Sequence, residues 1–334
     1  MSVSALQRIL LGPVQRPTAG PPWLAVGRQP STRNRTILGV LSFVLPVVFW
    51  CIVSYVPFVW HPLVEITDAA DVSYFTPGMK APRAVFDSAA AEAESAGLRP
   101  PQGRPANPIY LPAPHEVARA LWSAVIPSDT GDTSLLVAFA HSVKIIFWAF
   151  LISSLIGIPL GILCGSYPPI GRLTEPFIEF VRYLPAPAFG ALAVAVLGIH
   201  DGPKIAIVVL GTLFQQILIV TATTRRVDGA LLEAAQTLGA HKLRLVRTVI
   251  VPAVLPDLYR DQRILLGWAW TYLIVAELVG TSSGITFFIT QQARYQHFDN
   301  VYAAILILGI VGFGSDALLA RFGRWLFPWR RTSV

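Results

Sequence analysis

Charged residues are scarce in this chain of 334 residues. Only 13% of them are Asp, Glu, Lys or Arg, whereas 54% are hydrophobic, and the mean hydropathy is +0.57. Soluble domains carry roughly 25% charged residues. The composition therefore excludes an ordinary soluble domain and indicates a protein that crosses a membrane several times.

Cysteine and the common catalytic motifs are also scarce. The two cysteines, Cys51 and Cys164, both fall in apolar runs, so the sequence predicts neither a disulfide framework nor a thiol metal site. It contains no P-loop and no His-Glu-x-x-His motif, and its histidines lack the spacing of metal ligands. Residues 280–284 match Gly-x-Ser-x-Gly, but a nucleophile elbow needs a preceding strand, and here an apolar helix is expected. We therefore expect no metal site, no catalytic residue and no ATP-hydrolysing site in this chain.

Apolar runs of span length recur along the chain. A bilayer needs about 20 apolar residues per helix. The third run holds Pro185 and Pro187, which predict a broken helix, and such a break is tolerated at membrane depth where it lines a cavity or is covered by protein. Small residues in the second run favour close helix packing, namely Ser153, Ser154, Gly157, Gly161 and Gly165. The six predicted spans are 37–56, 141–164, 175–197, 205–224, 264–280 and 301–319.

The distribution of charge predicts the orientation. Residues 1–36 carry five arginines and no acid, and further arginines follow the last span, whereas residues 58–139 hold nine acids against five bases. Basic flanks favour the cytoplasmic side of a membrane. We expect both termini in the cytoplasm, and because the net charge of +7 lies mostly in these flanks, we do not expect nucleic acid as a partner.

One polar stretch between apolar runs, residues 233–252, reads EAAQTLGAHKLRLVRTVIVP. Asp228 is a suitable N-cap for a first short helix, and Gly239 is suited to end it. Residues 241–251 are expected to form a second, basic helix until Pro252 and Pro256 break it. The alanines of this elbow leave a bare face that another protein could approach closely.

The spacing within the elbow resembles the EAA loop of ATP-binding cassette (ABC) importer permeases. Glu-Ala-Ala is followed by three residues, Gly239, nine residues, Val249, one residue and Val-Pro. Val249 and Val251 stand where isoleucine and leucine are usual. In addition, residues 111–114 (Leu-Pro-Ala-Pro) with the amphipathic helix after them resemble the permeases that import nitrate, sulfonates, taurine or bicarbonate. The resemblance covers about residues 110–320.

The resemblance implies an all-α polytopic membrane protein of the MetI-like permease fold, with about six transmembrane helices and a cytoplasmic coupling helix. Together with the apolar runs and the distribution of charge, it divides the chain into five expected segments: a basic cytoplasmic tail (1–36), the first transmembrane helix (37–57), an extracytoplasmic insert (58–110), a permease core (111–320, with the coupling loop at 228–252) and a basic tail (321–334). We expect the insert to be a partly ordered loop without a core, and leave open whether it docks a partner.

The family's function is implied in the same way. The chain would form the path for a small solute, expected to be an anion, by ATP-driven alternating access in a bacterial inner membrane. Its partners would be a second permease copy, two ATPase subunits that hold ATP and Mg, and an extracytoplasmic solute-binding protein. The residues expected to transmit the ATPase motion are Glu233, Ala234, Ala235, Leu238, Gly239 and Ala240.

Several polar groups fall within the predicted spans. Glu179 and Arg182 share a helix face, and Arg182 is the expected partner of Glu277, because an unpaired carboxylate in hydrocarbon is costly. With Gln215 and Gln216 they are the candidates for the translocation path. The same residues are equally consistent with a structural ion pair that fixes helix packing.

Three alternatives compete with the importer interpretation. The elbow could be an amphipathic helix that lies on anionic lipid. A secondary transporter could couple ions through Glu277, although such transporters usually contain an internal repeat, which this sequence lacks. An integral membrane enzyme would have only Ser282 and His297 as a catalytic pair.

Overall fold

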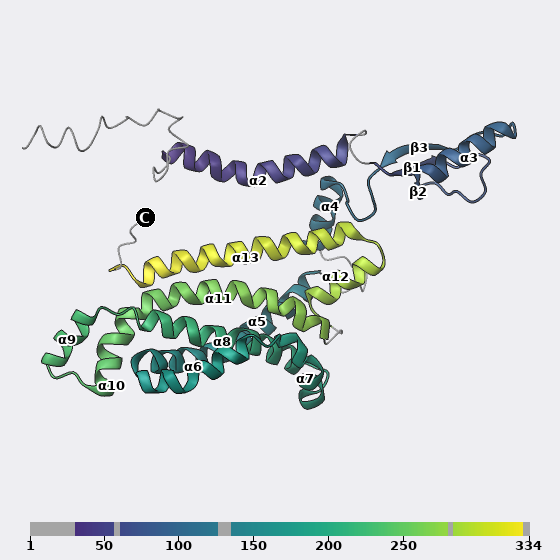
Figure 1. Ribbon diagram of the computed structural model, residues 1–334. Coiled ribbons are helices and arrows are strands. Elements are labelled where there is room, and N and C mark those ends of the chain that lie inside the picture. Colours follow the sequence, from purple (N-terminus) through teal and green to yellow (C-terminus); the bar gives the residue numbers. More distant parts are fainter. Residues whose placement is uncertain (1–30, 57–60, 126–134, 280–282, 330–334) are drawn as a thin grey trace, which may run out of the picture.

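The computed structural model describes residues 31–56, 61–125, 135–279 and 283–329, and its helices lie mostly side by side (Figure 1). Predictions that fall on other residues, such as the turn at 280–282 with Ser282 and most of the N-terminal tail, lie outside the described part. In chain order the elements are α2 (Thr32–Tyr55), β1 (Leu63–Asp68), β2 (Lys80–Pro82), α3 (Arg83–Ser95), β3 (Gln102–Ala106), α4 (Pro114–Val125), α5 (Leu135–Ser166), α6 (Pro168–Arg182), η2 (Ala186–Phe189), α7 (Gly190–Leu197), α8 (Asp201–Thr224), α9 (Gly229–Thr237), α10 (Lys242–Leu245), η3 (Val246–Ile250), α11 (Val251–Val279), α12 (Ile285–Arg294) and α13 (Phe298–Leu326).

Four of the described helices are long and apolar enough to cross a membrane: α2, α5, α8 and α13. The pair formed by α6 and η2 with α7 makes a fifth if it is taken as one span, and it bends by 83° at the break where Pro185 was expected to interrupt the helix. The sixth predicted span lies in α11, which is 29 residues long but carries charges along its length. By length and apolarity alone, the described residues therefore reach four or five spans rather than six.

Close packing of α5 on α8 depends on glycine, as the small residues predicted. A Cβ on Gly161 would lie 2.6 Å from the Cβ of Val220, and one on Gly165 would lie 2.5 Å from the Cβ of Thr224. The Ser153 and Thr212 hydroxyls share a hydrogen bond of 2.9 Å across the same contact. Only glycine therefore permits this backbone separation.

The main apolar core is shared by α5, α8 and α11. Branched and small side chains fill it, because a helix surrounded by other helices is buried on more than one face. Its fully buried members include Ile145, Ala149, Ile207, Val208, Ala269, Leu273 and Ala276. This core fixes α8 between α5 and α11.

The insert departs from the prediction of a coreless loop. Strands β2, β1 and β3 form an antiparallel sheet in that order, and α3 packs on it. Val64 and Ile66 are buried while Glu65 and Thr67 are exposed, an alternation typical of a strand. The core is small because it relies on Ile66, Phe75 and alanines, and the alanine-rich composition concealed it. The fold is thus helical with one small sheet module.

The outer helix α2 contacts the rest of the chain through aromatic side chains. Trp50 stacks on Tyr302 with ring centroids 5.8 Å apart, and its indole N–H donates to the Pro112 carbonyl at 3.1 Å. No residue in the most apolar stretch of α2 is buried. In the amphipathic helix α4, Val117 is buried, whereas Trp122 is 71% exposed.

Three connections between the predicted spans are largely helical. The connection after span 141–164 contains the start of α6, because Pro168 occupies the first helical position, where its missing N–H costs nothing. The connection before span 205–224 contains the first turn of α8, and the one before span 301–319 contains α12.

Candidate functional site

The first helix of the elbow, α9, begins and ends as the sequence predicted. The Asp228 carboxylate accepts a hydrogen bond from the Ala230 N–H at 3.0 Å and caps α9. Gly239 adopts a φ of +88°, and the Ala240 N–H donates to the Ala235 carbonyl at 2.9 Å. A left-handed residue followed by this hydrogen bond is the Schellman ending of a helix. The turn between α9 and α10 is therefore fixed by glycine.

The surface of α9 is exposed. None of its residues is buried, and neither is any residue of α10. Glu233 and Ala234 are exposed, Ala235 and Ala240 are partly exposed, and Leu238 is 88% exposed. Figure 1 shows α9 and α10 at one end of the helices, opposite to α12 and the insert. An exposed leucine beside bare alanines is a surface suited to contact with another protein.

The second half of the elbow differs from the prediction that its helix ends at Pro252. Pro252 and Pro256 do not break the helix, which continues from Lys242 through a π-helical turn, η3, into α11. A π turn shifts the hydrogen bonds from the fourth to the fifth residue, so it can accommodate the N–H that proline lacks. The elbow is consequently joined to α11 without an interruption.

Arg182 is not paired with either predicted carboxylate. Its guanidinium donates to Gln215 Oε1 at 3.4 Å and to the Tyr183 hydroxyl at 3.2 Å, and it lies 4.9 Å from the centre of the Tyr183 ring. No described contact joins it to Glu179 or Glu277. The prediction that Arg182 partners Glu277 is wrong, because α12 supplies nearer donors to Glu277. Arg182 is exposed at the end of α6, and its partner Gln215 on α8 is partly buried.

Glu179 makes no described ion pair or hydrogen bond with the other path candidates. It is exposed and lines a cavity with Glu175 and Arg225. Arg225 forms an ion pair with Glu175, and its Nη1 donates to Glu175 Oε2 at 3.0 Å. The arginine at the end of α8 therefore pairs with α6 through Glu175, a contact that the sequence analysis missed.

Gln216 faces away from Gln215, into the helix bundle. Its side chain is fully buried and donates to Ser154 Oγ at 3.0 Å and to Gln262 Oε1. This links α5, α8 and α11. Adjacent residues on a helix point about 100° apart, so only one of the two glutamines can share the side of Arg182. Gln262 was not predicted as a site residue, although it is a polar residue just before an apolar run.

Glu277 joins the end of α11 to the start of α12. Its side chain is 1% exposed, and its two oxygens accept hydrogen bonds from the Ser142 hydroxyl and from the Thr286 N–H, the latter at 2.8 Å. Ser142 in turn accepts from the Ile285 N–H at 2.8 Å. Gly284 has a φ of +105°, and a Cβ there would collide with the Glu277 carboxylate. Glu277 thus caps α12, a favourable place for a negative charge.

A second buried charge lies beside this cap. Lys204 is 1% exposed and donates to Ser283 O at 3.1 Å and to Ser283 Oγ at 3.0 Å. Ser283 Oγ also contacts His141 Nε2 at 3.0 Å, and His141 reaches Asp201 at 2.9 Å. Lys204 lies between the predicted spans 175–197 and 205–224, and no role was predicted for it. Its burial becomes evident only once α8 is known to begin at Asp201.

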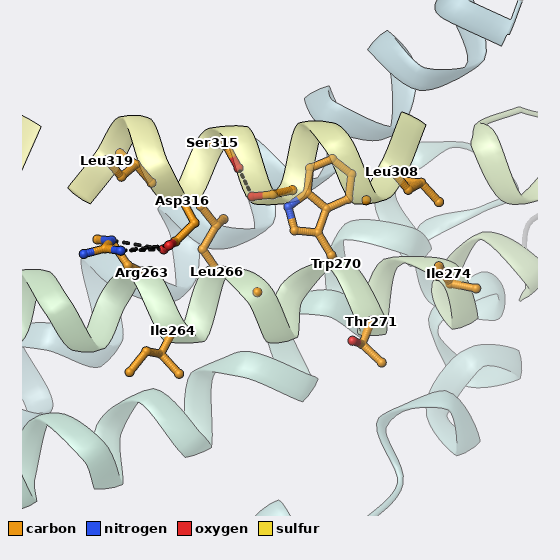
Figure 2. Close-up of a pocket in the computed structure, with 13 residues that line it drawn as sticks. Arg263, Ile264, Leu266, Trp270, Thr271, Ile274, Leu308, Ser315, Asp316 and Leu319 are labelled. Atoms are coloured by element: carbon orange, nitrogen blue, oxygen red, sulfur yellow. Dashed lines mark hydrogen bonds and ion pairs between the residues drawn. The ribbon is translucent and has the colours of Figure 1, made fainter. Parts of the chain in front are cut away.

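A cavity of about 500 Å³ lies between α11 and α13 (Figure 2). Arg263 and Asp316 close one end of it through a double ion pair with contacts of 2.8 to 3.1 Å, and Trp270 forms part of its wall. None of the predicted path residues lines this cavity. Its shape depends on two helices that are distant in sequence, so no local pattern could predict it.

The comparisons with known proteins agree with this geometry. Residues 157–331 match the family described as binding-protein-dependent transport system inner membrane component. The taurine transport system permease protein of Escherichia coli is 31% identical over 67% of this chain and 81% of its own length. A putative aliphatic sulfonates transport permease of Bacillus subtilis is 31% identical over 55% of this chain and 66% of its own length.

Further relatives and a solved structure extend the comparison. A bicarbonate transport system permease of Synechococcus elongatus is 30% identical over 54% of this chain and 64% of its own length. A chain of the inward-facing MetNI methionine ABC transporter has the same fold, with a TM-score of 0.51 at 19% identity, and the match covers 59% of this chain and 98% of that one. The chain therefore belongs to the binding-protein-dependent inner-membrane components, the multi-pass permease subunits of ABC importers, whose ATPase activity resides in a partner subunit and whose solute is delivered by a binding protein.

Proposed function

We propose that two copies of this chain, two ATPase subunits and one extracytoplasmic binding protein form an importer for a small anion of the sulfonate, taurine, nitrate or bicarbonate class. ATP and Mg would be held by the ATPase subunits. Relatives named for taurine, sulfonates and bicarbonate support the anion class. The arginine-rich flanks support an orientation with both termini in the cytoplasm.

The exposed face of α9 is the observation that carries the coupling mechanism. We assign Glu233, Ala234, Ala235, Leu238, Gly239 and Ala240 to contact with the ATPase. Leu238 extends from the helix end at 88% exposure, and the alanines beside it allow a partner's backbone to approach. The continuous helix from α10 through η3 into α11 would transmit movement of the elbow to the apolar core.

The anion path is assigned to the side of the bundle where α6 breaks. Arg182 is exposed there, and its bond to Gln215 ties α6 to α8. A guanidinium near a broken helix offers both charge and donors to an anion. Gln216, Glu277 and Glu179 receive different roles: Gln216 and Glu277 hold helices together, while Glu179 lies toward the Glu175–Arg225 ion pair.

Charge reversal at the elbow tests the coupling assignment. The chain is tagged and coexpressed with a candidate ABC ATPase subunit, the complex is purified, and ATPase recovery and solute uptake are measured. Glu233→Lys and Gly239→Leu should remove the ATPase or uncouple its activity, because one reverses the contact charge and the other forces a side chain into a left-handed backbone.

Glu94→Lys is the matched control, since Glu94 is exposed on α3 of the insert, at the opposite end from α9. It should retain the ATPase and its coupling. Normal ATPase recovery and normal uptake with both elbow variants would overturn the assignment.

A further inference from the structure

A separate cavity of about 370 Å³ lies where α11 ends against α12. Four of its lining residues, Phe287, Gln291, Arg294 and Tyr295, recur at helical spacing, so they share one face of α12. Leu278 of α11 adds an apolar wall. This α12 cavity lies at the end of the molecule opposite to α9 and α10 (Figure 1).

The donors of the α12 cavity are unused within the described part of the chain. Arg294 is exposed, and no described carboxylate lies within ion-pair distance of it. No described residue receives a hydrogen bond from the side chains of Arg294, Gln291 or Tyr295. The cavity therefore presents a guanidinium, an amide and a phenol together.

The one carboxylate in the cavity wall is already occupied. Glu277 accepts hydrogen bonds from the Ser142 hydroxyl and from the Thr286 N–H. Its negative charge is directed at the start of α12, whereas Arg294 lies at the end of that helix. The two charges are thus separated along α12, and the Arg294 end is the part that favours an anion.

We propose that the α12 cavity is a binding site for a small organic anion on its way through the permease. The acid group would bind Arg294, Gln291 and Tyr295, and a short apolar portion would contact Leu278 and Phe287. This proposal deepens the proposed function, on which it rests, by favouring an organic acid such as a sulfonate over a purely inorganic ion. A basic residue near a helix C-terminus also interacts favourably with the helix dipole. This interaction alone would explain Arg294, but it does not explain the two further donors and the apolar wall beside it.

Calorimetric titration of the purified permease with its ATPase subunits tests the site. Ethanesulfonate is the probe, because it joins an acid group to a short apolar chain, and ethylammonium is the probe of opposite charge. We expect saturable binding of ethanesulfonate only, and weaker binding of sulfate, which lacks the apolar portion. Arg294→Gln should weaken ethanesulfonate binding about tenfold or more, as expected for loss of a hydrogen bond to a charged group.

Arg119→Gln is the matched control, since Arg119 is exposed on α4 and lines a different cavity. It should bind the probe as the wild type does. Arg294→Lys retains the charge and should keep part of the affinity, which separates loss of the site from loss of folding. Absence of saturable binding to the wild type, or equal affinity in wild type and Arg294→Gln, would overturn the proposal. Recovery of the ATPase in the same preparation reports on the proposed function independently.

Discussion

Glu277→Ala should destabilise the chain by roughly 1 to 3 kcal/mol, because it leaves buried groups without partners. The Thr286 N–H would lose its acceptor, and an unsatisfied buried donor costs about 1 to 3 kcal/mol. Hydrogen bonds between membrane helices average only about 0.6 kcal/mol, which places the estimate toward the lower half. Ser142 keeps a second acceptor, the Ala138 carbonyl at 3.3 Å, so it contributes less to the loss.

Glu277→Gln should cost less than Glu277→Ala. One amide oxygen can still accept the Thr286 N–H, whereas the amide nitrogen replaces the other acceptor with a donor. The expected order of unfolding temperatures is wild type, then Glu277→Gln, then Glu277→Ala. Glu179→Gln is the control for loss of a carboxylate, since Glu179 is exposed and makes no described ion pair.

The buried thiol of Cys164 offers a direct assay. Cys164 is 0% exposed, and Cys51 is the other cysteine of the chain, so a Cys51→Ser background leaves one buried thiol. A thiol-reactive fluorophore then reports unfolding of α5 during heating in detergent. If Glu277→Ala exposes Cys164 at the same temperature as Glu179→Gln does, the assignment of Glu277 as the cap of α12 is wrong.

Two further changes test the packing and the path. Gly161→Ala should lower the unfolding temperature, because its Cβ would meet Val220 at 2.6 Å and overpacking costs about 1 to 3 kcal/mol. Gly309→Ala is the control, because the space around Gly309 is open. It should leave the stability unchanged or raise it by up to about 1 kcal/mol through helix propensity. Equal unfolding temperatures would contradict the close α5–α8 contact. Arg182→Gln should slow anion uptake by reconstituted importer while leaving the ATPase bound, since Arg182 is exposed and tied to Gln215 by a hydrogen bond of 3.4 Å. Normal uptake would remove Arg182 from the path, and loss of the assembled complex would make it structural.

Local chemistry allowed the elbow to be predicted well from sequence. A carboxylate at an N-cap and a glycine at a helix end act on their own backbone neighbours, so Asp228 and Gly239 took the predicted conformations. The break near Pro185 followed from the geometry of the proline ring in the same way. The glycines of α5 were also predictable, since helix contact in a membrane favours small residues.

The partners of the buried polar groups could not be predicted in this way. Arg182 and Glu277 were paired on the principle that a buried charge needs a counter-charge, yet Glu277 is satisfied by Ser142 and by the N–H of Thr286. A backbone donor exposed at a helix start has no signature in composition. The helix break predicted at Pro252 and Pro256 was wrong for a similar reason, because the π turn that accommodates them cannot be recognised from the local sequence.

The sequence by itself determined what kind of protein this is. Apolar length and the arginine-rich flanks are properties of consecutive residues and predict a protein that crosses a membrane several times, and the resemblance of the elbow to the EAA loop predicts a permease. Only the tertiary structure decided which polar side chains meet. Helices α5, α8, α11 and α12 bring together residues more than 130 positions apart, such as Ser142 and Glu277. Burial then selects, among many polar groups of similar appearance, those that hold helices together, such as Gln216 and Glu277.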